Sequence, residues 1–534
     1  MKNLFFAAVL FLSTALSLHS QVFTRSELPT KVKDPWEITY GPDNFLWVTD
    51  SGGAVSRIDP YDGSKLLVYR AQDYSSGSPL EKLQACFNPN IGTGTFGLAL
   101  HPEFLNPETA YIYFVYSYKS GTEAAPATKF KLKRLKWDVN TLSVVQDTDL
   151  VTMISSGYDH LGGRLLIVKQ NNIPYLFLSI GDHGVSETNS PTCYSPQSTN
   201  PNNAAQDPTT QNGKILRFNM DGSIPSDNPL PGYSFYTRGH RNPQGLMYNP
   251  NLDIIYDVEH GDRSDDEINI LQKGMNYGWK FVRGFHNDNN FPGEAEYVAN
   301  YVPNPNIAND ALIEPLYSFC ASSNQDTSSD FLEWCTVAPS DGIYYGSTGI
   351  PEWTNSLLVV TLKNGLETDM EVYQFKLQQD GKLVPATTEK PNPKKYFAND
   401  QLLNGRLRDI AVSPDGRRIF LVNNSGNDRD KITVYTYDSL ASGVEEYPVD
   451  ENFSMYPNPT MDFSTINYTL TSPKNISIKA YNLLGEEVAS AQDGIQNEGQ
   501  HSVKLETGTI PAGIYVVRFK VESNVRYQKL VITR

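Results

Sequence analysis

The stretch from Gly245 to Val258, GLMYNPNLDIIYDV, decides the fold of this chain. Two short apolar runs, Gly245–Tyr248 and Ile254–Val258, flank a turn at Asn249-Pro250. Short apolar runs on either side of a turn that contains Pro or Asn are typical of a β-hairpin. The pattern occurs six times in the chain. The other five copies pair Trp36–Tyr40 with Phe45–Val48, Gly97–Leu100 with Tyr111–Tyr116, Arg164–Val168 with Tyr175–Ile180, Gly342–Tyr345 with Leu357–Leu362, and Asp409–Val412 with Ile419–Val422.

Further strand-like stretches lie between these copies, so each repeat unit holds about four strands. They include Val55–Ile58, Phe130–Trp137, Lys214–Phe218 and Ile432–Tyr437. One such unit cannot bury both of its faces, whereas several units stacked radially can. The repeats therefore predict an all-β fold with a six-bladed β-propeller. An irregular β-sandwich is the alternative.

Composition limits the kinds of partner that the chain can have. Its 534 residues are more than one compact domain usually holds. The net charge of −16 argues against nucleic acid or an anionic membrane as the main partner, since both favour a basic face. With 31 Tyr and only 19% charged residues, the chain is typical of β-rich proteins with polar loops.

The N-terminus has the features of a secretory signal peptide. A basic start is followed by the apolar run Leu4–Leu18, and the small residue Ser20 precedes the polar Gln21. We therefore expect residues 1–20 to be a signal peptide, and the mature protein to be soluble and either secreted or held at the cell surface. A buried N-terminal strand or helix is the alternative. No later run reaches the ~18 apolar residues that a membrane helix needs.

Export permits disulfide bonds, and the chain has four cysteines. Four cysteines allow three pairings, which the sequence does not distinguish. Cys320 and Cys335 bracket one loop and are the first candidate pair, and Cys86 with Cys193 is the second. The absence of a Cys-x-x-Cys motif argues against a zinc site or a thiol redox centre.

The hairpin repeat also predicts where function lies. In a hairpin, the start of the first strand and the end of the second lie at the same end. Unusual polar residues occupy these positions, so we expect them to line one mouth of the propeller. They are His160, Asp182, Arg241, Asn242, Gln244, Gly261, Asp262, Trp334, Thr336, Lys363, Arg406 and Arg408. A His beside a carboxylate can accept a proton, Arg and Lys can hold a ligand with several carboxylates, and backbone carbonyls can bind calcium. This combination indicates redox or hydrolytic chemistry on a neutral substrate.

Four motifs carry a resemblance to a known family. They are Gly239–Gly245 (GHRNPQG), Ser264–Asn269 (SDDEIN), Asn276–Trp279 (NYGW) and Asp221–Pro225 (DGSIP). They resemble soluble quinoprotein glucose dehydrogenases and related aldose sugar dehydrogenases, and the similarity spans residues 33–438 in order along the chain. The resemblance implies a propeller with pyrroloquinoline quinone (PQQ) over calcium in the central mouth. It also implies oxidation of the anomeric carbon of an aldose to a lactone.

The resemblance assigns catalytic roles to three residues. His160 resembles the general base that takes the proton of the anomeric hydroxyl, and Asp182 resembles the carboxylate that orients it. Arg241 resembles the residue that stabilises negative charge on the quinone oxygen.

Ligand-binding roles follow from the same resemblance. The cofactor-binding positions correspond to Asn242, Thr336, Lys363, Arg406 and Arg408. The backbone carbonyls of Gly261 and Asp262 correspond to calcium ligands, and Gln244 and Trp334 border the sugar.

Several positions depart from the glucose enzymes. The turn Gly92–Gly97 lacks the expected substrate-contacting Gln. His260 replaces Gln, Asp262 replaces Pro, and Leu161 replaces a polar residue. These changes affect the rim where sugar would bind, so the identity of the sugar is open. Gly92–Gly97 also matches Gly-x-Gly-x-x-Gly, but it precedes an apolar strand rather than a helix, which argues against a dinucleotide site.

Two polar segments raise the question of further metal sites. The group Asp265–Glu267 can bind a metal, although we favour a cluster at a strand edge that anchors the mouth by hydrogen bonds. The loop His286–Asn290 loosely resembles a second, structural calcium site of the family.

The C-terminal part of the chain differs from the repeats. Residues 21–438 form the expected propeller domain, residues 439–452 read as a small polar linker, and residues 453–534 form a further domain. Its alternating segments predict a small β-sandwich. They are Ser464–Tyr468, Ile476–Tyr481, His501–Leu505, Gly513–Phe519 and Gln528–Ile532. The segments Tyr456–Pro459 and Pro511–Tyr515 resemble the sorting domain of the type IX secretion system, whose secretion machinery is then a partner. A carbohydrate-binding or adhesion sandwich is the alternative.

Two other functions compete with the quinoprotein dehydrogenase. A calcium-dependent propeller lactonase would place side-chain carboxylates on the metal and would not need Lys363, Arg406 and Arg408 together. A binding propeller for carbohydrate or protein would have kept the fold and lost the chemistry. The sequence allows a homodimer and leaves the electron acceptor open.

Overall fold

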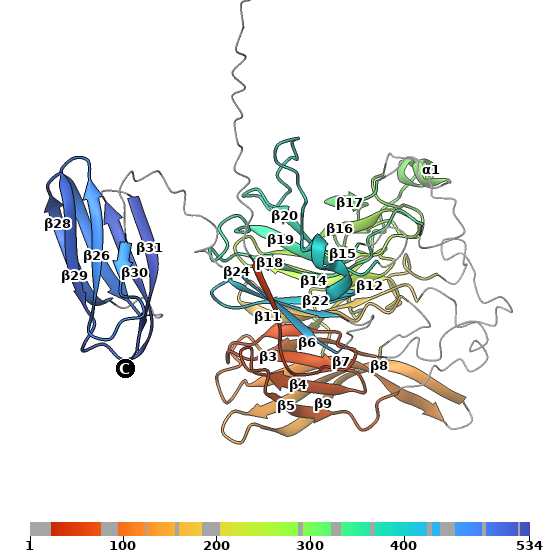
Figure 1. Cartoon of the computed structure of the whole chain (residues 1–534). Helices are drawn as coiled ribbons and strands as arrows, with labels where there is room; N and C mark the ends of the chain where they lie inside the picture. The colour runs from red at the N-terminus through yellow and green to blue at the C-terminus, as the bar shows by residue number, and fades with distance from the viewer. Residues whose placement is uncertain are drawn as a thin grey trace, which may run out of the picture. The chain divides into compact units, whose positions relative to one another are not determined.

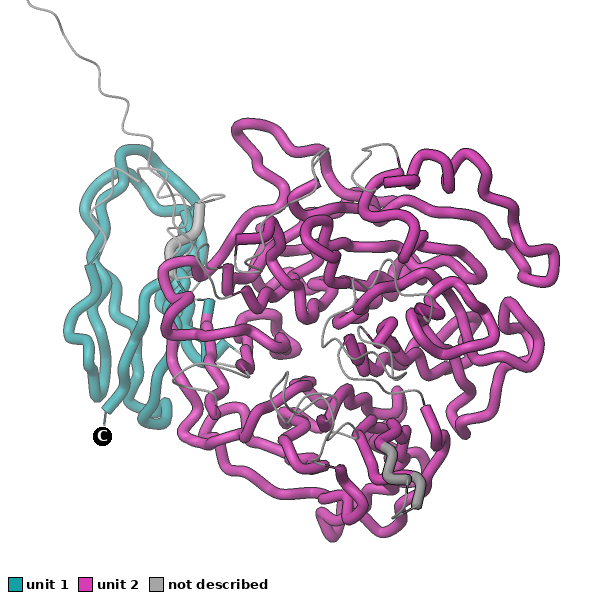
Figure 2. Tube along the Cα trace, turned by 90° about the vertical axis from the view of Figure 1, so that its right-hand side faces the viewer, with its two compact units in different colours: residues 1–23, 437–534 teal, residues 24–436 magenta. Residues whose placement is uncertain are grey.

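The computed structural model describes most of the chain, and almost all of the described part is β-structure. The described residues are 23–75, 94–122, 125–154, 160–183, 203–286, 292–321, 333–363, 369–423, 430–437, 454–482, 487–521 and 524–533. Residues 24–436 form one compact unit, and residues 454–533 lie in a second (Figure 2). The helices of the described part are short: α1 (Glu294–Ala299), α2 (Gln401–Asn404) and the 3-10 turn η3 (Ala398–Asp400).

Residues 24–436 contain six four-stranded sheets within the described part of the chain (Figure 1). The first three are β2 (Ile38–Tyr40), β3 (Leu46–Asp50), β4 (Ala54–Ile58), β5 (Lys65–Arg70); β6 (Thr95–Leu100), β7 (Tyr111–Thr122), β8 (Ala125–Asp138), β9 (Ser143–Ile154); and β10 (Leu165–Gln170), β11 (Ile173–Ile180), β12 (Lys214–Asn219), β13 (Phe235–Arg238). The next two are β14 (Pro243–Asn249), β15 (Ile254–Glu259), β16 (Asp266–Leu271), β17 (Tyr317–Phe319); and β18 (Pro339–Tyr345), β19 (Ser356–Thr361), β20 (Val372–Lys376), β21 (Lys394–Tyr396). The last combines β22 (Leu407–Val412), β23 (Arg418–Asn423) and β24 (Ile432–Tyr437) with β1 (Phe23–Glu27).

The six sheets close into a ring. The first strands of neighbouring sheets contact one another in the order β2, β6, β10, β14, β18, β22, and β22 contacts β2 again. The N-terminal strand β1 lies beside β24, and the Leu28 N–H donates to the Ile432 carbonyl at 3.0 Å, so both ends of the unit meet in one sheet. Closure of this kind leaves only short sheet edges open to solvent. The predicted β-propeller is thereby confirmed, with one sheet for each repeat.

Apolar packing between the sheets explains why the repeats fold in this way. Every residue of β3 and of β19 is buried, as expected for strands covered on both faces. Between the first two sheets, the Trp47 ring packs edge-on against Phe104 and against Trp137, with centroids 5.4 Å apart in each pair. Burial of each such side chain stabilises the fold by roughly 1.5–3 kcal/mol.

The second unit is a small β-sandwich, as the sequence predicts. One sheet is formed by β25 (Ser454–Tyr456), β26 (Phe463–Leu470) and β29 (Gly499–Glu506), and the other by β28 (Glu487–Gln496), β27 (Lys474–Tyr481), β30 (Gly513–Val521) and β31 (Asn524–Ile532). Side chains of both sheets, including Ile466, Ile478 and Phe519, fill one shared core.

Some sequence predictions concern residues outside the described part. These are the signal peptide at 1–20, the linker at 439–452, Cys86, Cys193 and most of the loop His286–Asn290. The other predicted disulfide, between Cys320 and Cys335, is confirmed. Among the described helices, none has the length and apolar character that crossing a membrane requires.

Candidate active site

The centre of the candidate site is a histidine held by a carboxylate. Nδ1 of His160 lies 2.7 Å from Oδ1 of Asp182, which follows β11. The other oxygen of Asp182 accepts the indole N–H of Trp279 at 2.7 Å and the amide N–H of Asn203 at 2.9 Å. The Asp182 side chain is fully buried, and that of His160 is only 7% exposed. The carboxylate therefore fixes the imidazole and is itself fixed from two further sides.

A glycine lets these two residues approach. A Cβ atom on Gly181 would lie 1.9 Å from the carbonyl oxygen of His160, so no other residue fits here. His160 itself has a φ of 48°, in the left-handed region. The backbone N–H of Asp182 donates to the Arg241 carbonyl at 2.8 Å, which joins the third and fourth sheets at the site.

Arg241 is held over an aromatic ring in the same mouth. Its backbone N–H donates to Glu259 at 2.8 Å, and its guanidinium lies 5.6 Å from the Trp279 ring centre and donates to the His260 carbonyl at 3.2 Å. Nε of Arg241 is buried without a hydrogen-bond partner in the described structure. A buried guanidinium with an unused donor is suited to a ligand that brings an acceptor.

Three further cations lack carboxylate partners within the described residues. Lys363 donates to the Trp334 carbonyl, and Arg406 donates to the Leu362 carbonyl at 3.0 Å. Arg408 stacks 3.1 Å above the Trp36 ring. Burial lowers the pKa of both arginines, and for Arg408 the nearby Arg164 and Arg406 lower it further. This unneutralised positive charge fits a ligand that carries several carboxylates.

The side chains of Asn242 and Gln244 lie next to Arg408. The amide of Gln244 donates to Asn242 at 2.6 Å, and its oxygen accepts from Arg408 at 2.9 Å. The Thr336 N–H donates to the Trp334 carbonyl at 2.9 Å, next to the Lys363 contact. Gln244 thus links Arg408 to Asn242.

The acidic group Asp265–Glu267 is built into hydrogen bonds. Asp266 accepts the N–H of Gly261 at 2.8 Å and those of Val337 and Ala338 at 2.7 Å each, which ties the fourth sheet to the segment before β18. Burial raises the pKa of Asp266 to about 6. These hydrogen bonds agree with the anchoring role that we favoured over metal binding from the sequence.

The predicted calcium position lies at this anchor. A Cβ on Gly261 would lie 2.0 Å from the Ser264 carbonyl oxygen, so the turn requires glycine. The Asp262 carboxylate is committed to arginine, 2.5 Å from Arg283 and 3.8 Å from Arg241.

His260, one of the departures from the glucose enzymes, lies at the same mouth. Its Nε2 is buried and has no hydrogen-bond partner among the described residues. Burial and the neighbouring Arg241 and Arg408 charges lower the pKa of His260 well below its ordinary value. The imidazole is therefore neutral at pH 7.

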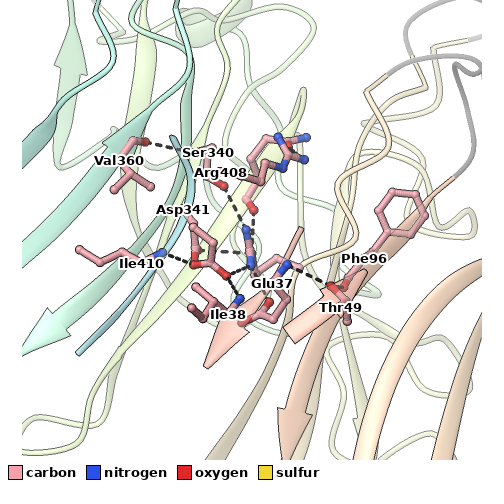
Figure 3. Close-up of polar contacts among 12 residues, drawn as sticks. Glu37, Ile38, Thr49, Phe96, Ser340, Asp341, Val360, Arg408 and Ile410 are labelled. Carbon is pink, nitrogen blue, oxygen red and sulfur yellow. Dashed lines mark hydrogen bonds and ion pairs between the residues drawn. The ribbon is translucent and has the colours of Figure 1, made fainter. Parts of the chain in front are cut away.

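The sequence analysis did not identify a buried charged cluster that lies near Arg408 (Figure 3). Arg164 is 2% exposed and lies 2.5 Å from Glu37, 2.9 Å from Asp409 and 3.3 Å from Asp341. Burial and Asp409 raise the pKa of Glu37 to about 8, and burial raises that of Asp341. Arg164 also donates to the Gln244 carbonyl at 3.1 Å, so the cluster supports the strand that carries that residue.

The repeat itself contained the signal for this cluster. Glu37, Arg164, Asp341 and Asp409 stand at corresponding positions, at the start of the first strand of four repeats. Aligning the repeats would have placed these residues around one axis.

Comparison with known proteins identifies the family of the chain. The glucose/sorbosone dehydrogenase family model matches residues 32–432. Quinoprotein glucose dehydrogenase B of Acinetobacter calcoaceticus is 29% identical over 457 residues, which cover 76% of this chain and 87% of that protein. Aldose sugar dehydrogenase YliI of Escherichia coli is 25% identical, over 81% of this chain and 98% of its own.

Solved structures show the same fold. The PQQ-bound aldose sugar dehydrogenase from Streptomyces coelicolor has a TM-score of 0.53 and 19% identity, over 78% of this chain and 99% of its own. The apo-form of soluble aldose sugar dehydrogenase from Escherichia coli has a TM-score of 0.55 and 21% identity, over 78% and 100%. Residues 454–533 match the secretion system C-terminal sorting domain. The chain therefore belongs to the glucose/sorbosone dehydrogenase family and carries a sorting domain at its C-terminal end.

Proposed function

We propose that this protein is an exported, PQQ- and calcium-dependent dehydrogenase that oxidises the anomeric carbon of an aldose sugar to a lactone. The observation that carries the proposal is the meeting of the His160–Asp182 pair with cations that have no carboxylate partner among the described residues. A proton acceptor beside the cations Lys363, Arg406 and Arg408 suits an acidic redox cofactor and a neutral substrate.

The described residues fit PQQ by their charge and hydrogen-bonding capacity. Lys363, Arg406 and Arg408 would hold the carboxylates of PQQ, and Asn242 and Thr336 would add polar contacts. The Nε atoms of Arg241 and Arg408, buried and without a hydrogen-bond partner in the described part of the chain, are donors that such an anion would use. The carbonyl oxygens of Gly261 and Asp262 suit calcium, which prefers oxygen ligands.

The chain's own residues would divide the work of the reaction. PQQ, when bound, supplies the acceptor for the hydride of the anomeric carbon. Because Nδ1 of His160 faces Asp182, proton transfer from the anomeric hydroxyl falls to Nε2. Asp182 would stabilise the imidazolium that forms, and Arg241 would stabilise negative charge that develops during hydride transfer. Gln244 and Trp334 would border the sugar.

The His160→Ala variant tests the role of the histidine. We expect it to retain PQQ through desalting, because His160 is not among the cations that would hold the PQQ carboxylates. Turnover should fall by on the order of 10²–10⁴-fold. Dye reduction and quinone absorbance measured on one preparation separate the two effects. Full turnover in His160→Ala would refute the assignment of the base.

We also infer that the C-terminal unit directs export through the secretion machinery and takes no part in catalysis. The match of residues 454–533 to a sorting domain supports this inference. A chain that ends before residue 439 should not reach the medium when produced in a host with that machinery. Its purified form should keep the activity of the full chain, and release of the shortened chain into the medium would contradict the inference.

A further inference from the structure

A buried group of acidic side chains lies on one face of the fourth sheet, next to the segment that carries Arg241. Strands β15 and β16 pair so that Asp257 lies opposite Asn269 and Glu259 lies opposite Glu267. Because side chains alternate between the two faces of a strand, these four share one face. Three carboxylates are thus gathered in the interior, where like charges directly opposite one another destabilise a sheet.

A buried histidine contacts this group. Nδ1 of His240 lies 3.1 Å from Oε1 of Glu259 and 3.7 Å from Oδ2 of Asp257. The ring of Tyr277 stacks on the imidazole with centroids 4.6 Å apart. His240 and Asp257 are fully buried, and Glu259 is 4% exposed.

Asp257 has no hydrogen-bond donor within the described structure. Both of its carboxylate oxygens are buried without a hydrogen-bond partner among the described residues. The amide of Asn269, the residue opposite, donates instead to Glu259 and to Glu267, at 3.1 Å each. Glu259 also accepts the Arg241 backbone N–H at 2.8 Å. An ionised carboxylate without donors in the interior is unfavourable, so Asp257 needs either a proton or a cation.

We propose that His240, Asp257 and Glu259 bind a divalent transition-metal ion of the zinc class inside the propeller. Their ligand atoms all lie within 4.8 Å of one another. Zinc holds nitrogen and oxygen ligands at about 2.0–2.2 Å, so neighbouring ligands of a tetrahedral site lie roughly 3.3–3.6 Å apart. The observed separations of 3.1 and 3.7 Å need only small adjustments to reach this spacing.

The donor set favours zinc-like ions over calcium. An imidazole nitrogen suits zinc, cobalt or nickel, whereas calcium takes oxygen ligands. Nε2 of His240 lies 2.8 Å from the hydroxyl of Thr237, a contact that can orient the ring with Nδ1 toward the ion. The amide oxygen of Asn269 is also buried without a donor among the described residues, and it provides a further oxygen at this face.

The ion would act on the mouth only through the backbone. Glu259 accepts the N–H of Arg241, so a metal on Glu259 would stiffen the segment that carries the arginine. The proposal does not depend on the dehydrogenase function, since none of its three ligands is assigned to PQQ or sugar. A protonated Asp257 without metal is the competing state, because burial, Glu259 and Glu267 raise the pKa of Asp257.

Cobalt(II) binding to the full chain tests the site. The protein is freed of metals by chelation and kept without PQQ, and cobalt chloride is added while the visible d–d band is recorded. We expect one cobalt per chain in a site with nitrogen and oxygen ligands. The Asp257→Asn variant should bind cobalt at least tenfold more weakly. Asp253→Asn, in the exposed turn of the same hairpin, should bind it like the wild type.

Metal analysis of the wild-type chain covers the case in which Asp257→Asn does not fold. Protein produced with zinc in the medium should keep one zinc per chain through desalting, and adding zinc to the metal-free chain should raise its melting temperature more than calcium does. No retained zinc together with no cobalt band, or equal cobalt binding by folded Asp257→Asn, would overturn the proposal. Because no PQQ is present in these assays, this outcome is independent of the dehydrogenase test.

Discussion

Nδ1 of His160 lies 2.7 Å from Oδ1 of Asp182 at one mouth of the propeller. This carboxylate also accepts hydrogen bonds from Trp279 and Asn203, so it cannot turn away from the imidazole without losing two further contacts. The geometry is that of a base with an orienting acid, and it gathers residues from separate parts of the chain. The proposed chemistry depends on this contact.

Asp182→Asn should lower kcat strongly while PQQ binding stays unchanged. The asparagine keeps the shape of the side chain but removes the charge that would stabilise a protonated His160. We expect a loss on the order of 10²–10⁴-fold in kcat, the usual contribution of general-base catalysis. Steady-state dye reduction measures it, with Asp221→Asn in an exposed turn as the control. An unchanged kcat would show that the contact is only structural.

Removal of the cations should weaken cofactor binding rather than chemistry. Lys363→Ala combined with Arg408→Ala removes two donors that have no carboxylate partner in the described structure. A hydrogen bond to a charged group contributes about 1.5–3 kcal/mol, so each substitution should weaken PQQ binding roughly 10- to 100-fold. Calorimetric titration of PQQ into the apoprotein measures this, and Lys382→Ala on the exposed β20–β21 connection serves as the control. Equal affinities in the double variant and the wild type would place the cofactor elsewhere.

Local pattern predicted the inner hairpins but not the strands that depend on ring closure. The run Ile254–Val258 became β15, which is one residue longer. Strand β1 was missed because FTRSE has little apolar pattern, and its partner β24 lies about 400 residues away along the chain. In the second unit, β28 was missed because its residues are only partly buried.

The candidate site was predictable where residues fall at repeat boundaries. His160, Asp182 and Arg241 were singled out in this way, and the structure brings them together. Trp279 entered only as part of a motif, because its contact with Asp182 depends on a turn after β16 that no local pattern describes. The Arg164 cluster takes its residues from four repeats, so no pattern within a single repeat reveals it, and only an alignment of the repeats would have found it.

Arg164→Met should destabilise the propeller. The substitution leaves Glu37, Asp341 and Asp409 in the interior without their shared cation. Breaking a buried ion pair in this way costs about 3–5 kcal/mol. All six Trp lie between residues 36 and 353, so Trp fluorescence during urea unfolding reports this unit alone.

The matched control for Arg164→Met is Arg417→Met, on the exposed turn before β23. The loss in Arg164→Met should be larger at pH 8 than at pH 5, since the freed carboxylates can take up protons in acid. A loss below about 1 kcal/mol at pH 8 would mean that the cluster is not a stability determinant.

His260 should make the propeller less stable in acid. Burial lowers the pKa of His260 in the folded state, so below about 6.5 the unfolded chain binds a proton that the folded chain does not. The free energy of unfolding therefore falls as the pH drops through this range, by at most about 1.4 kcal/mol per pH unit. His260→Gln should flatten this fall between pH 7 and pH 5 in Trp-monitored unfolding, whereas His501→Gln in the second unit should not. Parallel curves for His260→Gln and the wild type would contradict this prediction.

Dye reduction by the purified apoprotein tests the central claim most directly. The assay uses a panel of aldoses, with and without PQQ and calcium, on protein freed of both. The account predicts turnover only when PQQ and calcium are present together, with the panel ranking the sugars that the altered rim accepts. No turnover on any aldose, together with no quinone absorbance retained after desalting, would contradict the account and indicate a propeller that kept the fold without the chemistry.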